Sequence, residues 1–261
     1  MTASSTSSFI TRRRRVTVLL FTFAAGCVDA VTYLRAHVFT ANMTGNSVLL
    51  GIAIGEGHGP AAASSVTALI AFIVGVLVGA VLAGEGGDKA KTFTAVRREV
   101  FFEAAILALF AAACIAPPTT KVGSSVIVLI TTSGIAMGMQ SAAVKRLGLP
   151  GIATTYITGT ITSLFSGLVH NWLVHKKQVA GEISHRSSSG APSVRHSLGL
   201  QAQVFLAYTV AALISAVIHA RWPAIVAILP VLAIAGIGIY MLFVRPAAAA
   251  TSQVPRQNLS A

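Results

Sequence analysis

Six long apolar runs constrain this chain more than any other feature of its sequence. Each is about 17 to 23 residues long and nearly free of charge, at residues 16–34, 61–83, 100–116, 122–144, 200–218 and 222–244. A helix of about 20 apolar residues crosses the roughly 30 Å hydrocarbon core of a bilayer. With 54% hydrophobic and 10% charged residues, the chain does not have the composition of a soluble domain. The sequence predicts an all-α polytopic membrane protein.

The segments outside these runs are too short to bury a core of their own. We therefore expect a single membrane domain at residues 16–245, with one half at about 16–118 and the other at about 122–245. Residues 1–15 form a basic stretch and residues 246–261 a polar one, and we predict that both are disordered tails.

The net charge of +12 does not indicate nucleic-acid binding, because the basic residues lie in short loops beside the apolar runs. That distribution is typical of membrane topology and of attraction to anionic lipid. We expect the lipid bilayer and a small polar solute as partners, and no nucleic acid. The oligomeric state stays open.

The sequence shows no nucleotide-binding glycine loop, no nucleophile elbow and no zinc-protease motif. No His, Asp and Glu residues have the spacing of metal ligands. We therefore expect no cofactor, no metal and no catalytic residue, and we predict that the protein is not an enzyme.

Two further segments are ambiguous: residues 46–55 are too short to span, and residues 158–174 are interrupted by polar side chains. If both span, giving eight helices, 11 Lys and Arg lie inside and 8 outside. If both enter and leave on the same side, the numbers become 16 and 3. Because Lys and Arg concentrate in cytoplasmic loops, we predict about six spans plus two short re-entrant or broken helices. The N-terminus would be cytoplasmic and the membrane the bacterial inner membrane.

The two halves share a faint motif. The sequence GCVDA at residues 26–30 precedes MTGN at residues 43–46, while GMQSA at residues 138–142 precedes ITGT at residues 157–160. The offset between them is about 112–114 residues. An odd number of spans in each half would invert one half relative to the other, as in many transporters. Chance similarity between glycine- and threonine-rich segments is the alternative.

Asp29 is the acidic side chain deepest in the first apolar run, about 13 residues beyond Val16 and so roughly 20 Å along a helix. A carboxylate at that depth is costly unless it has a partner or a function. It could carry a proton, bind a cation or contact a solute. The alternative is a structural hydrogen bond or ion pair, for example with Tyr33 or Arg35.

Two short polar motifs stand directly before apolar helical stretches, at residues 44–46 and 158–160. Helices that start near the midplane present free N–H groups and a positive dipole end to the centre, which suits an anionic or strongly polar solute. Ordinary helix caps in wet loops are the alternative. The predicted substrate-binding residues are Asp29, Thr40, Asn42, Thr44, Gly45, Asn46, Gln140, Thr155, Thr158, Gly159 and Thr160.

The sequence also makes predictions for two polar residues and for three pairs of glycines. Gln140 lies near the place of Asp29 in the second half and offers a neutral amide there. Glu103 lies close to Arg97 and Arg98, which predicts an ion pair at the membrane interface. Three glycine pairs with the spacing of close helix packing are expected inside the bundle, at residues 51 and 55, 75 and 79, and 134 and 138.

The chain resembles the YoaK-like family of bacterial multi-spanning membrane proteins, a group of unknown function. The resemblance rests on residues 26–30 and 39–46 in the first half and on residues 138–142 and 154–160 in the second. It covers about residues 16–244. Ser141 departs from the Asn that we expect after Gln140. The resemblance implies an inner-membrane protein with about six spans, and it implies no reaction.

Our leading hypothesis from the sequence is a permease for a small polar or anionic solute, coupled to protons through Asp29. A passive channel with the same pore is one alternative. A non-transport membrane scaffold or lipid-binding protein is another.

Overall fold

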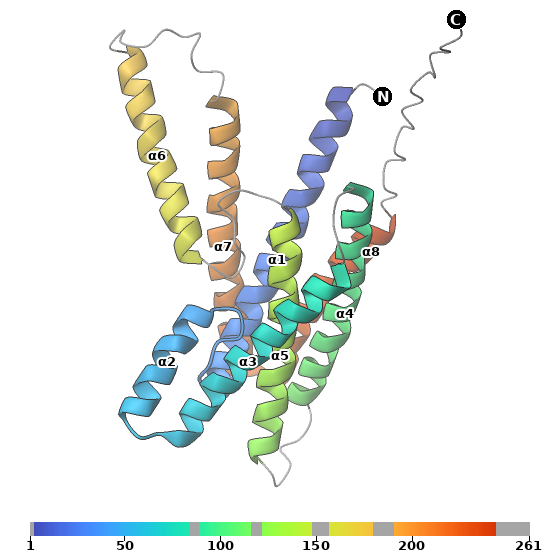
Figure 1. Cartoon of the computed structure of the whole chain (residues 1–261), viewed down its shortest axis with the longest axis vertical. Coiled ribbons are helices and arrows are strands. Elements are labelled where there is room, and N and C mark those ends of the chain that lie inside the picture. Colours follow the sequence, from blue (N-terminus) through green and yellow to red (C-terminus); the bar gives the residue numbers. More distant parts are fainter. Residues whose placement is uncertain (1–2, 84–88, 116–121, 148–156, 180–190, 244–261) are drawn as a thin grey trace, which may run out of the picture.

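The computed structural model describes residues 3–83, 89–115, 122–147, 157–179 and 191–243. The ordered elements within these ranges are eight α-helices and one short 3₁₀ segment, η2, without a strand (Figure 1). They are α1 Ala3–Ala36, α2 Met43–Gly55, α3 Gly59–Ala83, α4 Lys89–Ile115, α5 Val122–Leu147, α6 Ile157–Val179, α7 Ala191–Arg221, η2 Ile225–Ala227 and α8 Ile228–Phe243. The predicted all-α class is confirmed.

Within the described part of the chain, five segments are long and apolar enough to cross a membrane. They are Arg15–Ala36, Gly59–Leu82, Ser125–Arg146, Leu198–Arg221 and Ile225–Leu242. Of the expected sixth span at residues 100–116, residues 100–115 form the second half of α4, and residue 116 lies outside the described residues. This segment does not meet the same standard, because the last 18 residues of α4 include Arg98, Glu99 and Glu103.

Helix α1 is longer than the sequence predicted. It begins at Ala3, so it includes most of the segment that we expected to be a disordered tail. No proline or glycine interrupts residues 3–15, arginine is a good helix former, and extending an existing helix costs far less than nucleating one. The other predicted tail, residues 246–261, lies outside the described residues.

Two arginines show how the helix ends meet. Arg35, at the end of α1, donates hydrogen bonds to the carbonyls of Cys114 at the end of α4 and Pro223 after α7. Arg146, at the end of α5, donates to the carbonyl of Ala80 near the end of α3. Helices α1, α4 and α7 therefore run in one direction and α3 and α5 in the other (Figure 1).

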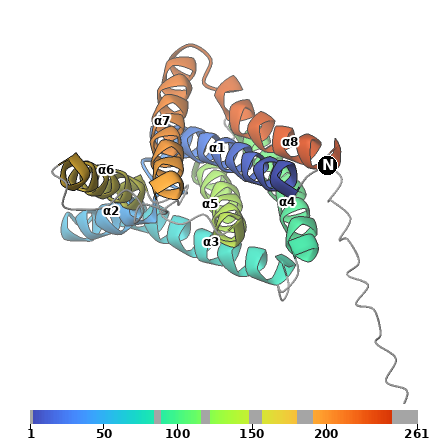
Figure 2. The ribbon, with the colours of Figure 1, turned by 90° about the horizontal axis from the view of Figure 1, so that it is seen from above.

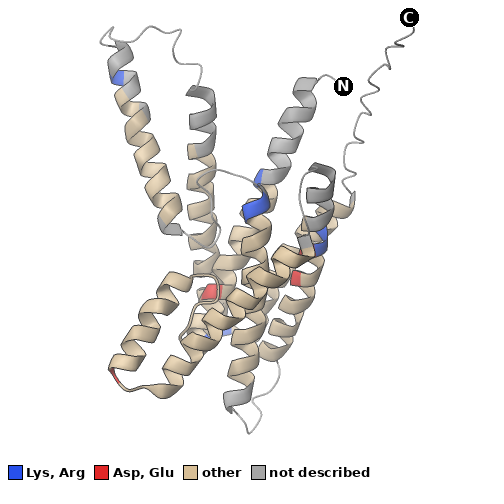
Figure 3. Ribbon diagram, viewed as in Figure 1, with Lys and Arg blue, Asp and Glu red and all other residues tan. Residues whose placement is uncertain are grey.

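The described Lys and Arg residues are distributed unevenly along this axis. Most lie toward the end of the bundle at which α1 and α4 begin, and few toward the opposite end (Figure 3). This polarity is the one that the loop charges of the sequence imply for a membrane protein with a preferred orientation.

Glycines allow α3 and α5 to approach closely. A Cβ added at Gly75 would lie 2.1 Å from the carbonyl oxygen of Ile135, and one at Gly138 would lie 2.2 Å from that of Phe72. Helices in lipid associate largely by such close backbone contact. The expectation of packing inside the bundle fails for Gly51 and Gly55 of α2, where an added Cβ would meet nothing within 4 Å.

The core lies between α1, α4, α5 and α8, with α1 and α5 at its centre (Figure 2). Its largest fully buried apolar side chains include Phe21, Leu107, Phe110, Ile130, Met137 and Ile234. Helix α6 packs mainly against α7, and α2 packs mainly against α3. These two helices therefore lie at the periphery of the bundle.

Along the long axis of the bundle, helix α2 begins at an intermediate depth and not at the end of the bundle. After α1 ends at Ala36, His37 adopts a positive φ of 54°, and the chain turns back until the backbone of Thr40 reaches Asp29. Asp29 lies about 10 Å before the end of α1. The 13 residues of α2 then cover about 20 Å toward the end at which α3 begins. This is the short re-entrant helix predicted for the first half.

Candidate functional site

Asp29 lies at the centre of a hydrogen-bonded site formed by α1, the loop at residues 37–42 and α7. Its side chain is 2% exposed. Oδ1 accepts hydrogen bonds from the backbone N–H groups of Thr40 at 2.8 Å and Ala41 at 2.7 Å. Oδ2 accepts from the N–H of Asn42 at 3.1 Å and from the hydroxyl of Tyr208 at 2.5 Å. One carboxyl group therefore joins three segments of the chain.

Three successive backbone N–H groups that converge on one anion form a concave binding site of the kind that proteins use for anions. Hydrogen bonds to a carboxylate are shorter and stronger than those between neutral groups. Here the anion is a side chain of the protein itself. The Asp29 carboxyl group thus anchors the loop that leads into α2.

The alternative predicted for Asp29, a structural hydrogen bond that holds helices together, is present, but neither of the two example partners makes it. Tyr33 stacks on Phe39, with ring centroids 4.9 Å apart, and Arg35 binds the carbonyls of Cys114 and Pro223. The hydroxyl that reaches Asp29 belongs to Tyr208, 179 residues along the chain. No local pattern in the sequence indicates that pairing, because it depends on how α7 packs against α1.

Two asparagines hold the start of α2. The Asn42 side chain caps the helix by accepting from the N–H of Gly45 at 3.3 Å. Asn46 is fully buried; its Oδ1 accepts from the N–H of Phe39 at 2.9 Å and its Nδ2 donates to the carbonyl of the same residue. Both amides therefore support the loop. The cap is Asn42, whereas residues 44–46 lie inside α2, so the alternative that this motif caps the helix is wrong.

The remaining predicted residues of the first half have different surroundings. Thr40 is fully buried, and its hydroxyl has no hydrogen-bond partner among the described residues. Thr44 is exposed. Gly45 lies against the ring of Phe39. A Cβ added at Gly45 would lie only 2.8 Å from a carbon of that ring, so this position has no room for a side chain.

Gln140 does not join the Asp29 site. Its side chain is fully buried, and its Nε2 donates to the carbonyl of Phe21 in α1 at 3.0 Å. Phe21 lies eight residues before Asp29 in the same helix, which is about 12 Å. Gln140 therefore ties α5 to α1 at a different level, and its Oε1 has no partner among the described residues.

The second polar motif lies at the start of α6. Gly159 is exposed and Thr160 is buried. Thr158 belongs to the helix, but its side chain is outside the described part, and Thr155 lies outside the described residues. Helices α2 and α6 begin on the same side of the bundle (Figures 1 and 2). Among the residues that the structure describes, no extensive contact joins them.

Comparison with known proteins identifies the family. The family model described as "Protein of unknown function (DUF1275)" matches residues 17–241. The chain belongs to this family. It is 41% identical over 166 residues to the UPF0700 transmembrane protein YoaK of Bacillus subtilis, which covers 63% of this chain and 71% of that protein. No solved structure matches the chain. The resemblance to the YoaK-like family and the assignment as a membrane protein are confirmed.

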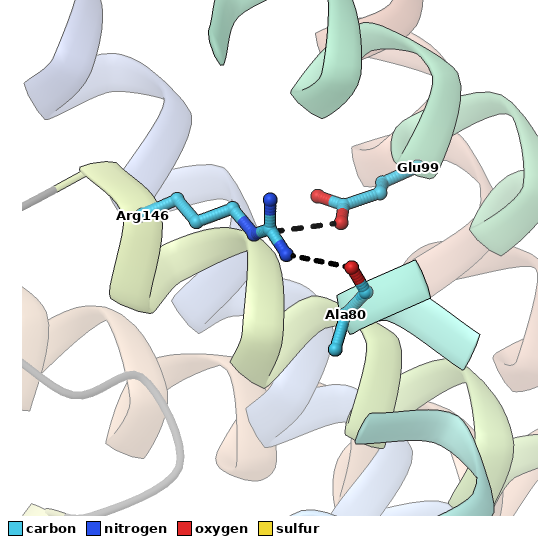
Figure 4. A network of polar contacts seen from close by, with 3 residues as sticks. All are labelled: Ala80, Glu99 and Arg146. Atoms are coloured by element: carbon cyan, nitrogen blue, oxygen red, sulfur yellow. Dashed lines mark hydrogen bonds and ion pairs between the residues drawn. The ribbon is translucent and has the colours of Figure 1, made fainter. Parts of the chain in front are cut away.

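This DUF1275 protein has a second buried polar group, the acids of α4, which the sequence did not indicate. Glu99 and Glu103 of α4 are each 1% exposed. The described contacts of Glu103 include no ion pair with Arg97 or Arg98, so the expected interfacial pair is not present. Arg146 instead lies 3.9 Å from Glu99, with Nε facing Oε1 (Figure 4).

The spacing of four residues between Glu99 and Glu103 could have indicated that both acids share one face of α4. Their burial and the partner on α5 could not be found from the sequence. Among the residues that the structure describes, no three His, Cys, Asp or Glu side chains gather as they would around a metal ion.

Proposed function

We propose that this DUF1275 protein is a permease for a small polar or anionic solute in the bacterial inner membrane, with its N-terminus in the cytoplasm. The observation that carries the proposal is the Asp29 site, where a buried carboxyl group holds the loop that starts a re-entrant helix. Irregular backbone at membrane depth is tolerated only where it is buried in protein or lines a cavity, and transporters use it for their binding sites.

The pattern of helix contacts, which an inverted repeat would produce, supports the same proposal. If α1 to α4 correspond to α5 to α8, the packing of α3 on α5 corresponds to that of α7 on α1, and the packing of α2 on α3 corresponds to that of α6 on α7. The pair α4 and α5 likewise corresponds to α8 and α1. Most of the extensive contacts of the bundle thus occur in matching pairs, or between a helix and its own counterpart; the packing of α3 on α4 is matched only by the contact of α7 with η2, the segment before α8.

A glycine contact agrees with this correspondence. Gly26 of α1 approaches the carbonyl of Tyr208 in α7, and Gly138 of α5 approaches the carbonyl of Phe72 in α3. The two glycines are 112 residues apart, the offset of the sequence motif. In the same alignment Asp29 corresponds to Ser141, whose hydroxyl donates to the carbonyl of Met137 in its own helix. The charged group is therefore specific to one half.

The solute would bind between the starts of α2 and α6. Helix α2 runs from the middle of the bundle toward one end, and α6 runs from the middle toward the other (Figure 1). Their positive ends would both face the centre, which suits an anionic or polar group. The buried hydroxyl of Thr40, the exposed Thr44 and the exposed Gly159 are the described groups that remain for contact with a solute.

Proton coupling would act through Asp29. All four of its contacts use the carboxyl oxygens as acceptors. A proton on one oxygen would convert an acceptor into a donor, so at least one contact would be lost in its present form. The loop would then be held less firmly against α1 and α7. Protonation would in this way change the position of the helix end that binds the solute.

The test is uptake by purified protein reconstituted into vesicles, across a broad panel of small polar and anionic solutes. We expect Asp29→Asn to lose uptake driven by a proton gradient, while the exposed-acid variant Glu56→Gln keeps it. Full activity of Asp29→Asn with unchanged pH dependence would contradict the coupling role. Uptake that never accumulates the solute against its concentration gradient would indicate a channel. The absence of flux for every solute would indicate a scaffold or lipid-binding protein.

A further inference from the structure

Glu99 and Glu103 are buried in the bundle, and the partly exposed Arg146 lies beside Glu99. The two acids are one turn apart on α4, each 1% exposed, and their carboxyl groups interact electrostatically. Both oxygens of Glu99 and Oε1 of Glu103 lack a hydrogen-bond partner among the described residues. The Asp29 carboxyl group, by contrast, accepts hydrogen bonds from four donors.

The charges available around the two acids do not balance. Helix α4 packs against α3, α5, α8 and η2. Within their described bounds, α3 and η2 carry no titratable side chain, and α8 carries only Tyr240. Helix α5 carries Lys145, which is exposed, and Arg146. Arg146 is therefore the cation that faces the pair.

The basic residues of α4 itself do not replace a second cation. Arg98 is exposed and Arg97 is half-buried. Arg98 interacts electrostatically with its neighbour Glu99, but it lies at the surface, and among the described residues neither arginine forms an ion pair with Glu103. Two ionised carboxylates would thus leave one negative charge without a partner, which is strongly unfavourable in the interior.

The position of Arg146 distinguishes the two acids. Its Nε lies 3.9 Å from Oε1 of Glu99, and its Nη2 donates to the carbonyl of Ala80 at 3.1 Å (Figure 4). Glu103 lies about 6 Å further along α4 and has no ion pair among the described residues. Two acids that share one cation retain one proton between them.

We propose that Glu99, Glu103 and Arg146 form a proton-binding site, in which Glu103 carries the proton at neutral pH and Glu99 is ionised beside Arg146. The ligand is a proton and not a metal cation, because a guanidinium this close to one of the acids repels a second cation. The site is separate from Asp29 and does not depend on transport.

Infrared spectroscopy of the purified protein tests this directly, because a protonated carboxyl group has a carbonyl stretch distinct from that of a carboxylate. At neutral pH we expect a band from a buried, protonated carboxyl group. Glu103→Gln should abolish it, whereas Glu56→Gln, which changes an exposed acid, should leave it unchanged. A wild-type protein without the band, or a band that persists in Glu103→Gln, would overturn the proposal.

A second variant keeps the test valid if Glu103→Gln folds poorly. Arg146→Gln removes the cation beside Glu99, so Glu99 should also take up a proton and the band should grow about twofold. Lys145→Gln, at the neighbouring exposed position, should leave the band unchanged. An Arg146→Gln band equal to the wild-type band would contradict the assignment of Glu99. Loss of the wild-type band on adding sodium at constant pH would show a metal-cation site and overturn the proposal.

Discussion

At the scale of single residues, the buried polar side chains of this protein divide into satisfied and unsatisfied groups. Asp29 and Asn46 use their acceptors and donors on nearby backbone groups. Glu103 and Gln140 each retain a buried oxygen without a partner among the described residues. The satisfied groups hold the loop before α2 in place. Of the unsatisfied ones, Glu103 is the titratable group, and it belongs to the proposed proton-binding site.

Tyr208→Phe should weaken the anchoring of this loop. The variant removes the hydroxyl that donates to Asp29 and leaves the ring in place. A hydrogen bond to a charged group contributes about 1.5–3 kcal/mol, so we expect a measurable fall in the thermal unfolding midpoint in detergent. Tyr33→Phe is the matched control, because the described contacts of Tyr33 are ring contacts. Equal midpoints for the two variants would contradict a role for the Tyr208 hydroxyl.

The sequence identified Asp29 and the polar loop after it, because both are costly groups in an apolar segment. It could not identify Tyr208, which is 179 residues away. It also assigned Gln140, which lies near the place of Asp29 in the second half, to the same substrate site, whereas the amide binds the carbonyl of Phe21. A motif gives the order of residues along a helix but not the neighbouring helix that each of them faces.

At the scale of the elements, apolar length and glycine spacing account for most of the architecture. Helix α2 is as short as its sequence requires. Helix α4 is the exception, since an apolar run of the right length is preceded by charged residues within the same helix. The backbone hydrogen bonds of a helix can continue through charged residues, so α4 begins before its apolar run. The apolar run shows only which side chains suit lipid or the protein core.

Gly138→Val should disrupt the contact between α3 and α5. A Cβ at this position would lie 2.2 Å from the carbonyl oxygen of Phe72, so the two helices would have to separate. We expect a loss of folded, monodisperse protein on size-exclusion chromatography. Gly51→Val is the control, because its Cβ would meet nothing. Normal folding of both variants would contradict the close approach.

At the scale of the whole molecule, the direction of the helices determines on which side of the membrane each loop lies. Arg35, at the end of α1, forms hydrogen bonds with the ends of α4 and α7. Arg146, at the end of α5, forms a hydrogen bond with the end of α3 and an ion pair with the first half of α4. With α2 re-entrant, the turn between α2 and α3 lies on the same side as the end of α1.

Topology reporters can test this arrangement. A reporter fused near residue 58 should be active outside the cell, and one fused at residue 89 should be active in the cytoplasm, because α3 alone crosses the membrane between them. A chain in which residues 46–55 span would give the reverse at both positions. Reporters at residues 15 and 58 on the same side would contradict the re-entrant helix α2.

The anchoring of the loop also has a consequence for sequence variation. Asp29 binds peptide N–H groups at positions 40, 41 and 42, so this contact requires nothing of the side chains there except that none is proline, which has no N–H group. We expect relatives to keep the acid while positions 40 and 41 vary within the limits of space; position 42 is restricted further because the Asn42 side chain caps α2. Where position 40 or 41 becomes proline, a different residue should replace the acid.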